Sequence, residues 1–378
     1  MIRRIYIDNF RCFTSFECQL QDIQLFLGRN GVGKSSVLDV LKILQGILVD
    51  AVSVDDNKRG FLTNTLTRWE SRPQQTFELE IEGNGGVYQY RLEVEHKRET
   101  YQCRIQSEEL KFDTQRLYYF DGTEAHLYRD DPSWDPGPAV PYNWSSSFIA
   151  SIPERKDNQK LVWFRDRVRR IFLYAIDPLS MASASNREQE TPDRAMHQLA
   201  SWLRHVSQEE LEAIPAILNS LKGVLEGLVG FRLEKSGDTA RTLKFEFEDP
   251  AVDKSMGSPG TFWLPLDELS EGQRCLVALF TIMHASVKPD CSVFIDEPNN
   301  FVALEEIQPW LVELNEKAYD SGCQLGLVSH HPSVANFLAS NHGLLVFRDG
   351  GGPARSKPFA WDIETAESPA EVIARGME

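Results

Sequence analysis

The apolar positions near the start of the chain predict a strand, a turn, a second strand, a glycine-rich loop and a helix. Ile5 and Ile7 alternate with polar residues, and the apolar residues at 23–27 have the spacing of a second strand. In residues 35–48 the apolar side chains recur at the spacing of one helix face. A glycine loop between a strand and a helix is an arrangement that suits phosphate binding.

The middle of the chain follows a different pattern. From about Phe77 to Tyr128, short alternating runs are separated by turn residues, which predicts an antiparallel meander. Residues 130–158 are rich in Pro, Ser and Asp and predict an exposed loop. Helical spacing follows in residues 161–175 and 197–229, but no heptad persists long enough for a long coiled coil.

Two strand-like runs, at 231–233 and 243–247, lead to a final block from Phe262 onward that again alternates helix and strand. Two α/β blocks with a different pattern between them predict an α/β, doubly wound mixed sheet that is split by an inserted β-meander and helical subdomain. The expected boundaries are 1–75 for the first part of the split α/β domain, 76–160 for the meander and loop, 161–260 for a helical lid or insertion, and 261–378 for the second part of the α/β domain.

Composition narrows the class of protein. The 378 residues are 42% hydrophobic and 25% charged, which is typical of a globular chain. Forty Lys and Arg against 56 Asp and Glu give a net charge of −16, which argues against a surface that coats DNA or anionic membrane as a whole. Six cysteines without paired C-x2-C spacing argue against a zinc site. With no secretory signal or apolar run long enough to span a bilayer, we expect a reduced, cytoplasmic protein without membrane contact.

Residues 28–35, Gly-Arg-Asn-Gly-Val-Gly-Lys-Ser, fit the G-x4-G-K-[ST] motif of a phosphate-binding loop. The glycines allow successive amides to point into one concavity, Lys34 supplies a charge to the outer phosphates, and the Ser35 hydroxyl would bind Mg²⁺. The spacing does not fit the G-x-G-x-x-G of a dinucleotide fold. The expected ATP-binding residues of this loop are Arg29, Asn30, Gly31, Gly33, Lys34, Ser35 and Ser36.

A second motif ends an apolar run at residues 292–295 with adjacent carboxylates, Asp296 and Glu297. A nucleotide hydrolase needs this pair, because one carboxylate can hold the Mg²⁺ ion while the next orients and deprotonates the attacking water. We therefore expect Asp296 to be a metal ligand and Glu297 to be the catalytic base.

The sequence LSEGQ at 269–273 precedes an apolar helix and resembles the signature motif of ABC-type ATPases. Together with GRNGVGKSS, VFIDEP, the LVSHHP at 327–332 and the NFRCF at 9–13, it is similar to the SMC/RecF-like branch of that superfamily. The order of elements and the stretch DEPNNFVALEEIQPWL most resemble standalone ATPases grouped with overcoming-lysogenization-defect and anti-phage defence ATPases. The resemblance covers the two outer blocks, about half of the chain, and implies a P-loop ABC-type ATPase head.

This resemblance implies roles for further residues. Ser270, Gly272 and Gln273 would bind the γ-phosphate of an ATP held by the other subunit, so that two protomers enclose two nucleotides; Ser270 and Gln273 also fit a helix capping box, and both roles can hold together. His330 would be the switch histidine at the γ-phosphate and the attacking water. Gln74 or Gln75, just before the first strand of the meander, would be the glutamine that senses the γ-phosphate, and Gln75 is our choice as the metal ligand.

The sequence departs from the family pattern in the turn after the carboxylate pair, at His331 and in the length of its insertion. Residues 299–304 follow the carboxylate pair where many relatives have a histidine-containing turn, and His331 stands where the related pattern more often has serine. The insertion between Ser35 and Ser270 is too long for a plain transporter subunit and lacks the heptads of an SMC arm. A scaffold that binds ATP without turnover would lack the base that Glu297 supplies.

The function expected from these motifs is a Mg²⁺-ATP-dependent ATPase that forms a head-to-head homodimer, or a higher oligomer, and acts as a switch in DNA-linked surveillance such as anti-phage defence or repair. The alternative is an ATP-gated sensor that controls a partner effector, a toxin or a nuclease, without touching DNA. DNA contact, if direct, would use residues 155–170, where seven basic residues face two aspartates and aromatic neighbours could stack on bases or anchor a helix. The acidic residues near the C-terminus are expected to be solvated surface.

Overall fold

The computed structural model describes residues 1–131, 137, 139–250, 260–361 and 368–375. Most of the acidic C-terminal residues considered above, namely Asp362, Glu364, Glu367 and Glu378, lie outside the described residues.

The chain divides into two compact units. The first contains Met1–Phe172, Asp290–Phe294 and Gln324–Glu378, and the second contains Leu173–Pro289 and Ile295–Cys323. Both outer blocks of the sequence contribute to the first unit, so residues far apart in the chain share one core.

The first unit contains most of a six-stranded sheet in the order β10-β15-β16-β3-β17-β18, of which the last two residues of β10 and of β15 are assigned to the second unit. Strands β16 and β17 run parallel to β3 on either side of it, and β18 is antiparallel to β17. All five residues of β3 are buried, as expected for a central strand covered on both faces. The strands are β3 (Ile23–Leu27), β10 (Ile171–Tyr174), β15 (Ser292–Asp296), β16 (Gln324–Val328), β17 (Gly343–Arg348) and β18 (Ala354–Pro358).

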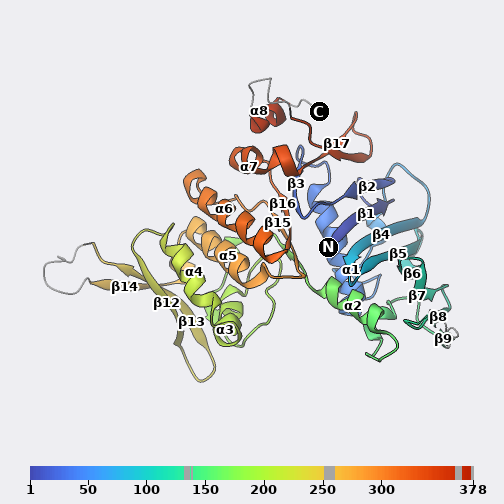
Figure 1. Cartoon of the computed structure of the whole chain (residues 1–378), viewed down its shortest axis with the longest axis horizontal. Helices are drawn as coiled ribbons and strands as arrows, with labels where there is room; N and C mark the ends of the chain where they lie inside the picture. Colours follow the sequence, from blue (N-terminus) through green and yellow to red (C-terminus); the bar gives the residue numbers. More distant parts are fainter. Residues whose placement is uncertain (132–136, 138, 251–259, 362–367, 376–378) are drawn as a thin grey trace. The chain divides into compact units, whose positions relative to one another are not determined.

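An eight-stranded antiparallel sheet in the order β2-β1-β4-β5-β6-β7-β8-β9 completes the strands of the first unit (Figure 1). The predicted meander is confirmed, and because β4 pairs with β1, it continues the sheet that the first strand begins. The strands are β1 (Ile2–Asp8), β2 (Phe16–Gln19), β4 (Gln74–Gly83), β5 (Gly86–Lys97), β6 (Gln102–Phe112), β7 (Gln115–Phe120), β8 (Glu124–Leu127) and β9 (Ala139–Pro141).

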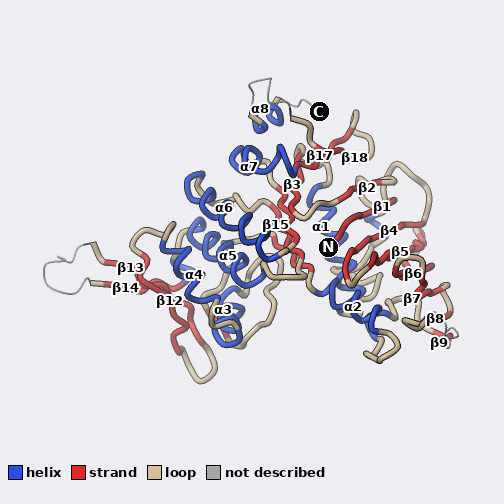
Figure 2. The backbone as a smooth tube through the Cα atoms, viewed as in Figure 1, coloured by secondary structure: helices blue, strands red, loops and turns tan. Residues whose placement is uncertain are grey.

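The helices of the first unit include the one predicted after the glycine loop. It is observed as α1, which begins at Lys34 and has buried residues on several sides, so it is a core helix. Figure 2 shows the alternation of helices and strands that the sequence predicts for the outer blocks. The helices are α1 (Lys34–Val49), α2 (Gln159–Arg169), α7 (Pro332–His342) and α8 (Pro369–Ala374).

The helix predicted over residues 161–175 is too long. Helix α2 ends at Arg169, and Ile171–Tyr174 forms β10 at the edge of the six-stranded sheet. The amide of Ser292 donates a hydrogen bond to the carbonyl of Arg170, which fixes the chain beside β15. The apolar residues of this segment fit either a helix or a strand by spacing alone, and pairing with a distant strand decides between them.

The second unit is built on helices and a small sheet. Helix α5 is its most buried helix, since nearly every residue from Cys275 onward is inaccessible to solvent. Within the described residues the longest helix is α6, with 18 residues, so none forms the long coiled coil that the sequence also argued against. The helices are α3 (Leu199–Glu209), α4 (Ala213–Lys222), α5 (Glu271–Ser286) and α6 (Leu304–Ser321), and the strands are β11 (Ala184–Ser185), β12 (Leu228–Lys235), β13 (Arg241–Glu248) and β14 (Thr261–Pro265). The helical pattern expected over 197–229 therefore breaks between α3 and α4 and ends before β12.

No helix among the described residues is both long enough and apolar enough to cross a membrane.

A buried carboxyl group lies in the core of the meander. Glu108 on β6 is fully inaccessible to solvent and accepts hydrogen bonds from the hydroxyls of Tyr90 (2.8 Å), Tyr118 (3.1 Å) and Ser147 (2.6 Å). Burial raises the pKa of Glu108 from 4.5 to about 7, although these hydroxyls oppose the shift. The protonated carboxyl is thus favoured by folding, because desolvation penalises the charged form.

We predict that Glu108→Gln makes the protein less sensitive to alkaline pH. The folded state binds the Glu108 proton more tightly than the unfolded state, so its contribution to stability is complete below about pH 4.5 and is lost as the pH rises through 7. The free energy of unfolding, measured with urea at pH 5 and pH 8, should therefore fall less in the variant than in the wild type as the pH rises. The difference between the two falls should be on the order of 2 kcal/mol. The exposed Glu99→Gln is the matched control, and an equal gap between Glu108→Gln and wild type at both pH values would contradict the prediction.

Candidate functional site

The phosphate loop leaves β3 at Leu27 and enters α1 at Lys34, as predicted. Gly28, Gly31 and Gly33 all have positive φ angles, of 136°, 79° and 114°. A Cβ atom on Gly28 would lie 2.1 Å from the carbonyl oxygen of Val346, and one on Gly33 would lie 2.6 Å from the Cys12 sulfur. Glycine is therefore required both by the backbone conformation and by the close packing under the loop.

The Lys34 side chain folds back onto the start of the loop and forms hydrogen bonds with it. The residue is only 6% exposed, and its Nζ donates to the carbonyl oxygens of Gly28 (2.7 Å) and Arg29 (3.1 Å). The ammonium group is thus held inside the curve of the loop, where a phosphate group would meet it together with the amides at the start of α1. Ser35 is exposed at the first turn of that helix.

The turn between β1 and β2 supports the loop from one side. Asn9 and Arg11 adopt left-handed backbone angles, with φ of 59° and 48°, and the turn places the Cys12 sulfur and the Phe13 ring against Gly33. The Arg11 guanidinium pairs with Asp39 and donates to the Ser36 hydroxyl at 3.3 Å. The NFR turn therefore has a structural role at this loop that its sequence alone does not specify.

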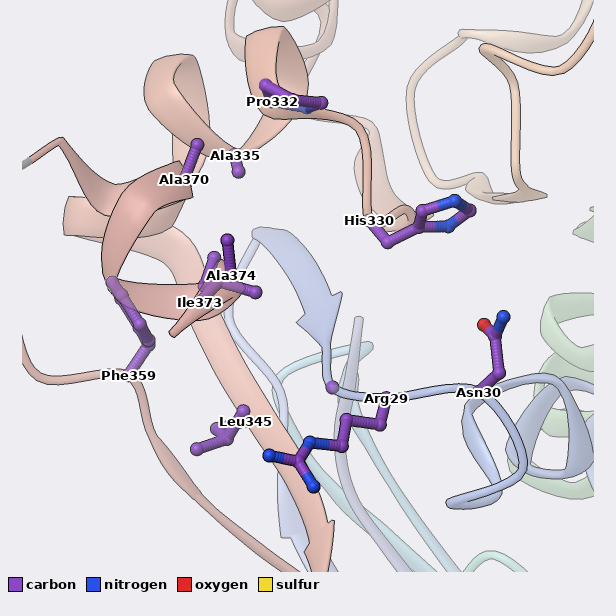
Figure 3. A pocket seen from close by; sticks show the side chains of 11 residues that line it. Arg29, Asn30, His330, Pro332, Ala335, Leu345, Phe359, Ala370, Ile373 and Ala374 are labelled. Atoms are coloured by element: carbon purple, nitrogen blue, oxygen red, sulfur yellow. The ribbon is translucent and has the colours of Figure 1, made fainter. Parts of the chain in front are cut away.

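A cavity of about 330 Å³ lies beside the loop in the first unit. Figure 3 shows the His330 ring and the Asn30 amide on one side of it and apolar side chains from α8 and the sheet on the other. The structure thus brings together three residues that the sequence singled out, His330 with Arg29 and Asn30, although they are 300 positions apart in the chain. The cavity is lined by Gly28, Arg29, Asn30, His330, Pro332, Ala335, Leu345, Phe359, Ala370, Ile373 and Ala374.

His331 caps α7. Its Nδ1 accepts a hydrogen bond from the amide of Ser333 at 3.3 Å, and its own amide donates to the Ser329 hydroxyl at 3.0 Å. Serine is among the preferred residues at such a cap, because its side-chain oxygen accepts from the same backbone position. The departure from the family pattern at His331 therefore keeps a side-chain cap at the N-terminus of α7.

The signature segment forms the N-terminus of α5 in the second unit. Ser270 is the N-cap, and a capping box is present: its hydroxyl accepts from the amide of Gln273 at 3.2 Å, and the Gln273 side chain accepts from the amide of Ser270 at 3.0 Å. Ser270 is exposed, so this helix end is accessible to an anion. A Cβ on Gly272 would lie 2.8 Å from the carbonyl oxygen of Phe301, which explains the need for glycine.

Asp296 ends β15, and Glu297 follows with a left-handed φ of 49°. This angle is uncommon for a residue with a side chain and is often found where function fixes the backbone. The Asp296 carboxylate is paired with Arg194, whose Nη2 lies 3.3 Å from Oδ2. Sequence reasoning missed Arg194, because it belongs to a polar segment without periodicity or a recognisable motif.

Gln75 is fully buried near the start of β4. Its amide nitrogen donates to the Asn9 carbonyl (3.0 Å) and the Thr65 hydroxyl (3.1 Å), and its oxygen lies 3.0 Å from His96 Nε2. Burial lowers the pKa of His96 to about 4, so this ring is neutral at pH 7. The role of Gln75 as a metal ligand stays a prediction, and it would require Gln75 to exchange these partners.

Part of the basic segment at 155–170 is packed into the first unit. Trp163 stacks on Tyr88, with ring centroids 4.8 Å apart, and Phe164 is buried, so these aromatic side chains anchor α2. Arg167 is 3% exposed and donates to the Ser292 hydroxyl at 2.7 Å. The basic residues of this segment that remain exposed are Arg155, Lys156, Arg169 and Arg170.

The residues present fit a nucleotide-bound magnesium ion. Mg²⁺ takes one or two protein oxygens together with substrate phosphates and water, so it needs no dedicated cage of acidic side chains. No cluster of three or more His, Cys, Asp or Glu suited to a metal occurs among the residues that the structure describes. Ser35, next to the Gly28–Lys34 cradle in the first unit, and Asp296, at the end of β15 in the second unit, each carry an oxygen of the kind that such an ion prefers.

The chain is similar to solved SMC head domains. An SMC head bound to the C-winged helix domain of ScpA aligns with a TM-score of 0.55 and 12% identity, covering 97% of this chain and 99% of that one. An SMC head with an extended coiled coil, bound to the C-terminal domain of ScpA derived from Pyrococcus furiosus, gives 0.50 and 9%, covering 100% and 99%. The SMC head domain from Thermotoga maritima gives 0.46 and 15%, covering 95% and 99%.

At these identities the likeness concerns the fold, and the first two matches confirm the predicted ABC-type head. No protein of curated function was found to match the chain. A family profile, described as "AAA domain, putative AbiEii toxin, Type IV TA system", matches residues 25–336, which is most of the chain and includes the phosphate loop, the signature segment and the carboxylate pair. The fold and this match agree on a nucleotide-binding head of the SMC-like ATPase type. The chain is therefore a member of this AAA-domain family.

Proposed function

We propose that this protein is a Mg²⁺-ATP-dependent ATPase that closes as a head-to-head dimer around two ATP molecules. The observation that carries the proposal is that two separate parts of one chain have a geometry suited to an anion: the loop around Lys34 and the exposed N-terminus of α5 at Ser270. A monomer that already has a complete phosphate loop has no use for a second phosphate site. In a dimer, the α5 terminus of one subunit would meet the γ-phosphate held by the loop of the other.

Each residue of the proposed site has a separate role in hydrolysis. Lys34 and the loop amides bind the phosphates, while Ser35 and Asp296 would hold Mg²⁺, which neutralises charge on the phosphate oxygens when it is bound. Glu297 accepts the proton of the attacking water, and His330 orients that water at the γ-phosphate. Ser270 and Gly272 of the partner add donors to the same phosphate, so turnover depends on closure.

The cycle proposed here works as a switch. ATP binding closes the dimer, and hydrolysis removes the γ-phosphate that both subunits grip, so the dimer reopens. We place this switch in DNA-linked surveillance such as anti-phage defence or repair. Any direct contact with DNA would use the basic residues of the segment that are exposed, namely Arg155, Lys156, Arg169 and Arg170.

A second candidate is an ATP-gated sensor that controls a partner effector protein. Two observations favour it. The aromatic residues of the basic segment are packed inside the unit and are therefore withdrawn from base stacking. In addition, SMC heads of this fold have been solved with domains of another protein, ScpA, bound to them. A partner of that kind, rather than DNA, would then receive the signal of closure.

The test is the molar mass of the protein in solution. We expect light scattering after size exclusion to give a monomer without nucleotide or with ADP, and a dimer with Mg²⁺ and a slowly hydrolysed ATP analogue, because only the γ-phosphate is shared by both subunits. An unchanged mass in all conditions would contradict the proposal. Stimulation of ATP turnover by duplex DNA, lost at high salt, would support the DNA role, and a small protein that co-purifies in stoichiometric amount would support the sensor.

A further inference from the structure

Arg194 lies directly on Asp296, the carboxylate proposed to hold the metal ion. The two charged groups are 3.3 Å apart, and their side chains are only 26% and 11% exposed. Both residues belong to the second unit. A guanidinium keeps its proton at any physiological pH, so this contact is a charge-assisted hydrogen bond that a change in protonation of the arginine cannot release.

The backbone holds Arg194 in this position. Its carbonyl accepts a hydrogen bond from the amide of Ala175 (2.8 Å), and the carbonyl of Ala195 accepts one from Asp177 (3.1 Å). Met196 follows, fully buried and with a left-handed φ of 65°. The segment that carries Arg194 is therefore fastened to the chain just after β10 and delivers the guanidinium to the end of β15.

We infer that Arg194 competes with Mg²⁺ for Asp296 and ties metal binding to nucleotide binding. The inference rests on the proposed role of Asp296 as the metal carboxylate. A divalent cation on Asp296 would lie beside a guanidinium of like charge, so Arg194 must leave the carboxylate before the metal can bind there. The phosphate oxygens of an arriving nucleotide are acceptors that suit the released guanidinium, whereas a metal ion alone brings no such acceptor.

In the protein without nucleotide, this competition leaves Asp296 paired with Arg194. A charged group that is mostly buried is tolerated when an opposite charge pairs with it. Arg194 provides this opposite charge for the Asp296 carboxylate. Metal ion without nucleotide would bind weakly, and Mg²⁺ would bind together with ATP. Arg194 is thus a positioning residue for the metal carboxylate.

The experiment measures metal binding directly, independently of turnover. Mn²⁺ is titrated in place of Mg²⁺ into the 378-residue protein without nucleotide, where Arg194 is expected to occupy Asp296, and free Mn²⁺ is counted by electron paramagnetic resonance. A neighbouring arginine typically lowers the proton affinity of a carboxylate by roughly tenfold or more, and we expect a comparable effect on a metal ion. Arg194→Ala and Arg194→Gln should therefore bind Mn²⁺ about tenfold more tightly than wild type, while Arg194→Lys, which keeps the charge, should stay near wild type.

Two further variants separate the possible failures. The exposed Arg187→Ala in the same segment loses the same charge away from the carboxylate and should leave Mn²⁺ affinity unchanged. Asp296→Asn should weaken Mn²⁺ binding, and an unchanged affinity would overturn the metal role of Asp296 and the inference with it. If Asp296→Asn weakens binding but Arg194→Ala and Arg194→Gln, folded by circular dichroism, bind Mn²⁺ equally or less tightly than wild type, the inference about Arg194 is wrong while the proposed function stands.

Discussion

Glu297→Gln is expected to trap an ATP-bound dimer and to lower ATP turnover by at least about a hundredfold, the usual contribution of a general base. The amide has the size of the carboxylate but cannot accept the proton of the attacking water. The loop around Lys34, the metal ligands and the α5 terminus are all retained, so ATP binding and closure should persist. The dimer should then accumulate, because its reopening depends on hydrolysis.

Size exclusion with light scattering in Mg²⁺-ATP gives the direct readout, together with the phosphate released per minute. Wild type should show a transient dimer that decays as ATP is consumed, and Glu297→Gln a lasting one. Glu305→Gln, an exposed glutamate at the start of α6, is the matched control, because it removes the same charge close in sequence without touching the carboxylate pair. A Glu297→Gln protein that remains monomeric in ATP, or that associates without nucleotide, would contradict the closed-dimer mechanism.

The second large effect is expected when two inactive variants are mixed. Lys34→Ala should lose about ten- to a hundredfold in ATP affinity, because hydrogen bonds from a charged donor are among the stronger ones. Ser270→Arg should bind ATP normally but fail to hydrolyse it, because it places a bulky cation at the helix end that grips the partner's phosphate. Each homodimer would then contain two defective sites.

A mixed dimer of these variants contains one site with an intact loop and an intact signature segment, contributed by different chains. If the two sites act independently, random pairing should restore about a quarter of wild-type turnover. Ser270→Asp is a useful companion, since aspartate preserves the helix cap but repels phosphate, and the same recovery on mixing would exclude misfolding as the cause. Full activity of Ser270→Arg alone, or no recovery in the mixture, would show that Ser270 does not act on the partner's nucleotide.

Local patterns were sufficient for the elements that carry chemistry. The glycine loop, the start of α1 and the carboxylates at the end of β15 were predicted from short stretches, because phosphate binding imposes glycine and lysine at fixed spacing. The cap at Ser270 was predicted for the same reason, since Ser and Gln three residues apart satisfy the exposed amides locally. The family profile and the fold comparison confirm the class of head that these motifs indicated.

Local patterns failed where a distant partner decides the outcome. Ile171–Tyr174 fits either a helix or a strand by spacing alone, and it becomes a strand because the edge of the six-stranded sheet is available to it. Trp163 could equally have been a base-stacking residue, and its position against Tyr88 gives it a packing role. Neither outcome can be obtained from residue spacing, which contains no information on what lies across the sheet or the core.

The sequence by itself determined that this chain has a phosphate loop, a signature helix cap and a strand ending in two carboxylates, because each depends on backbone geometry that neighbouring residues impose. Only the tertiary structure decided which other side chains meet them. It joined His330 to Arg29 and Asn30 in one cavity, buried Gln75 among Asn9, Thr65 and His96, and placed Arg194 on Asp296. Such contacts join segments far apart in the chain, and folding fixes them through packing and charge pairing rather than through any local signal.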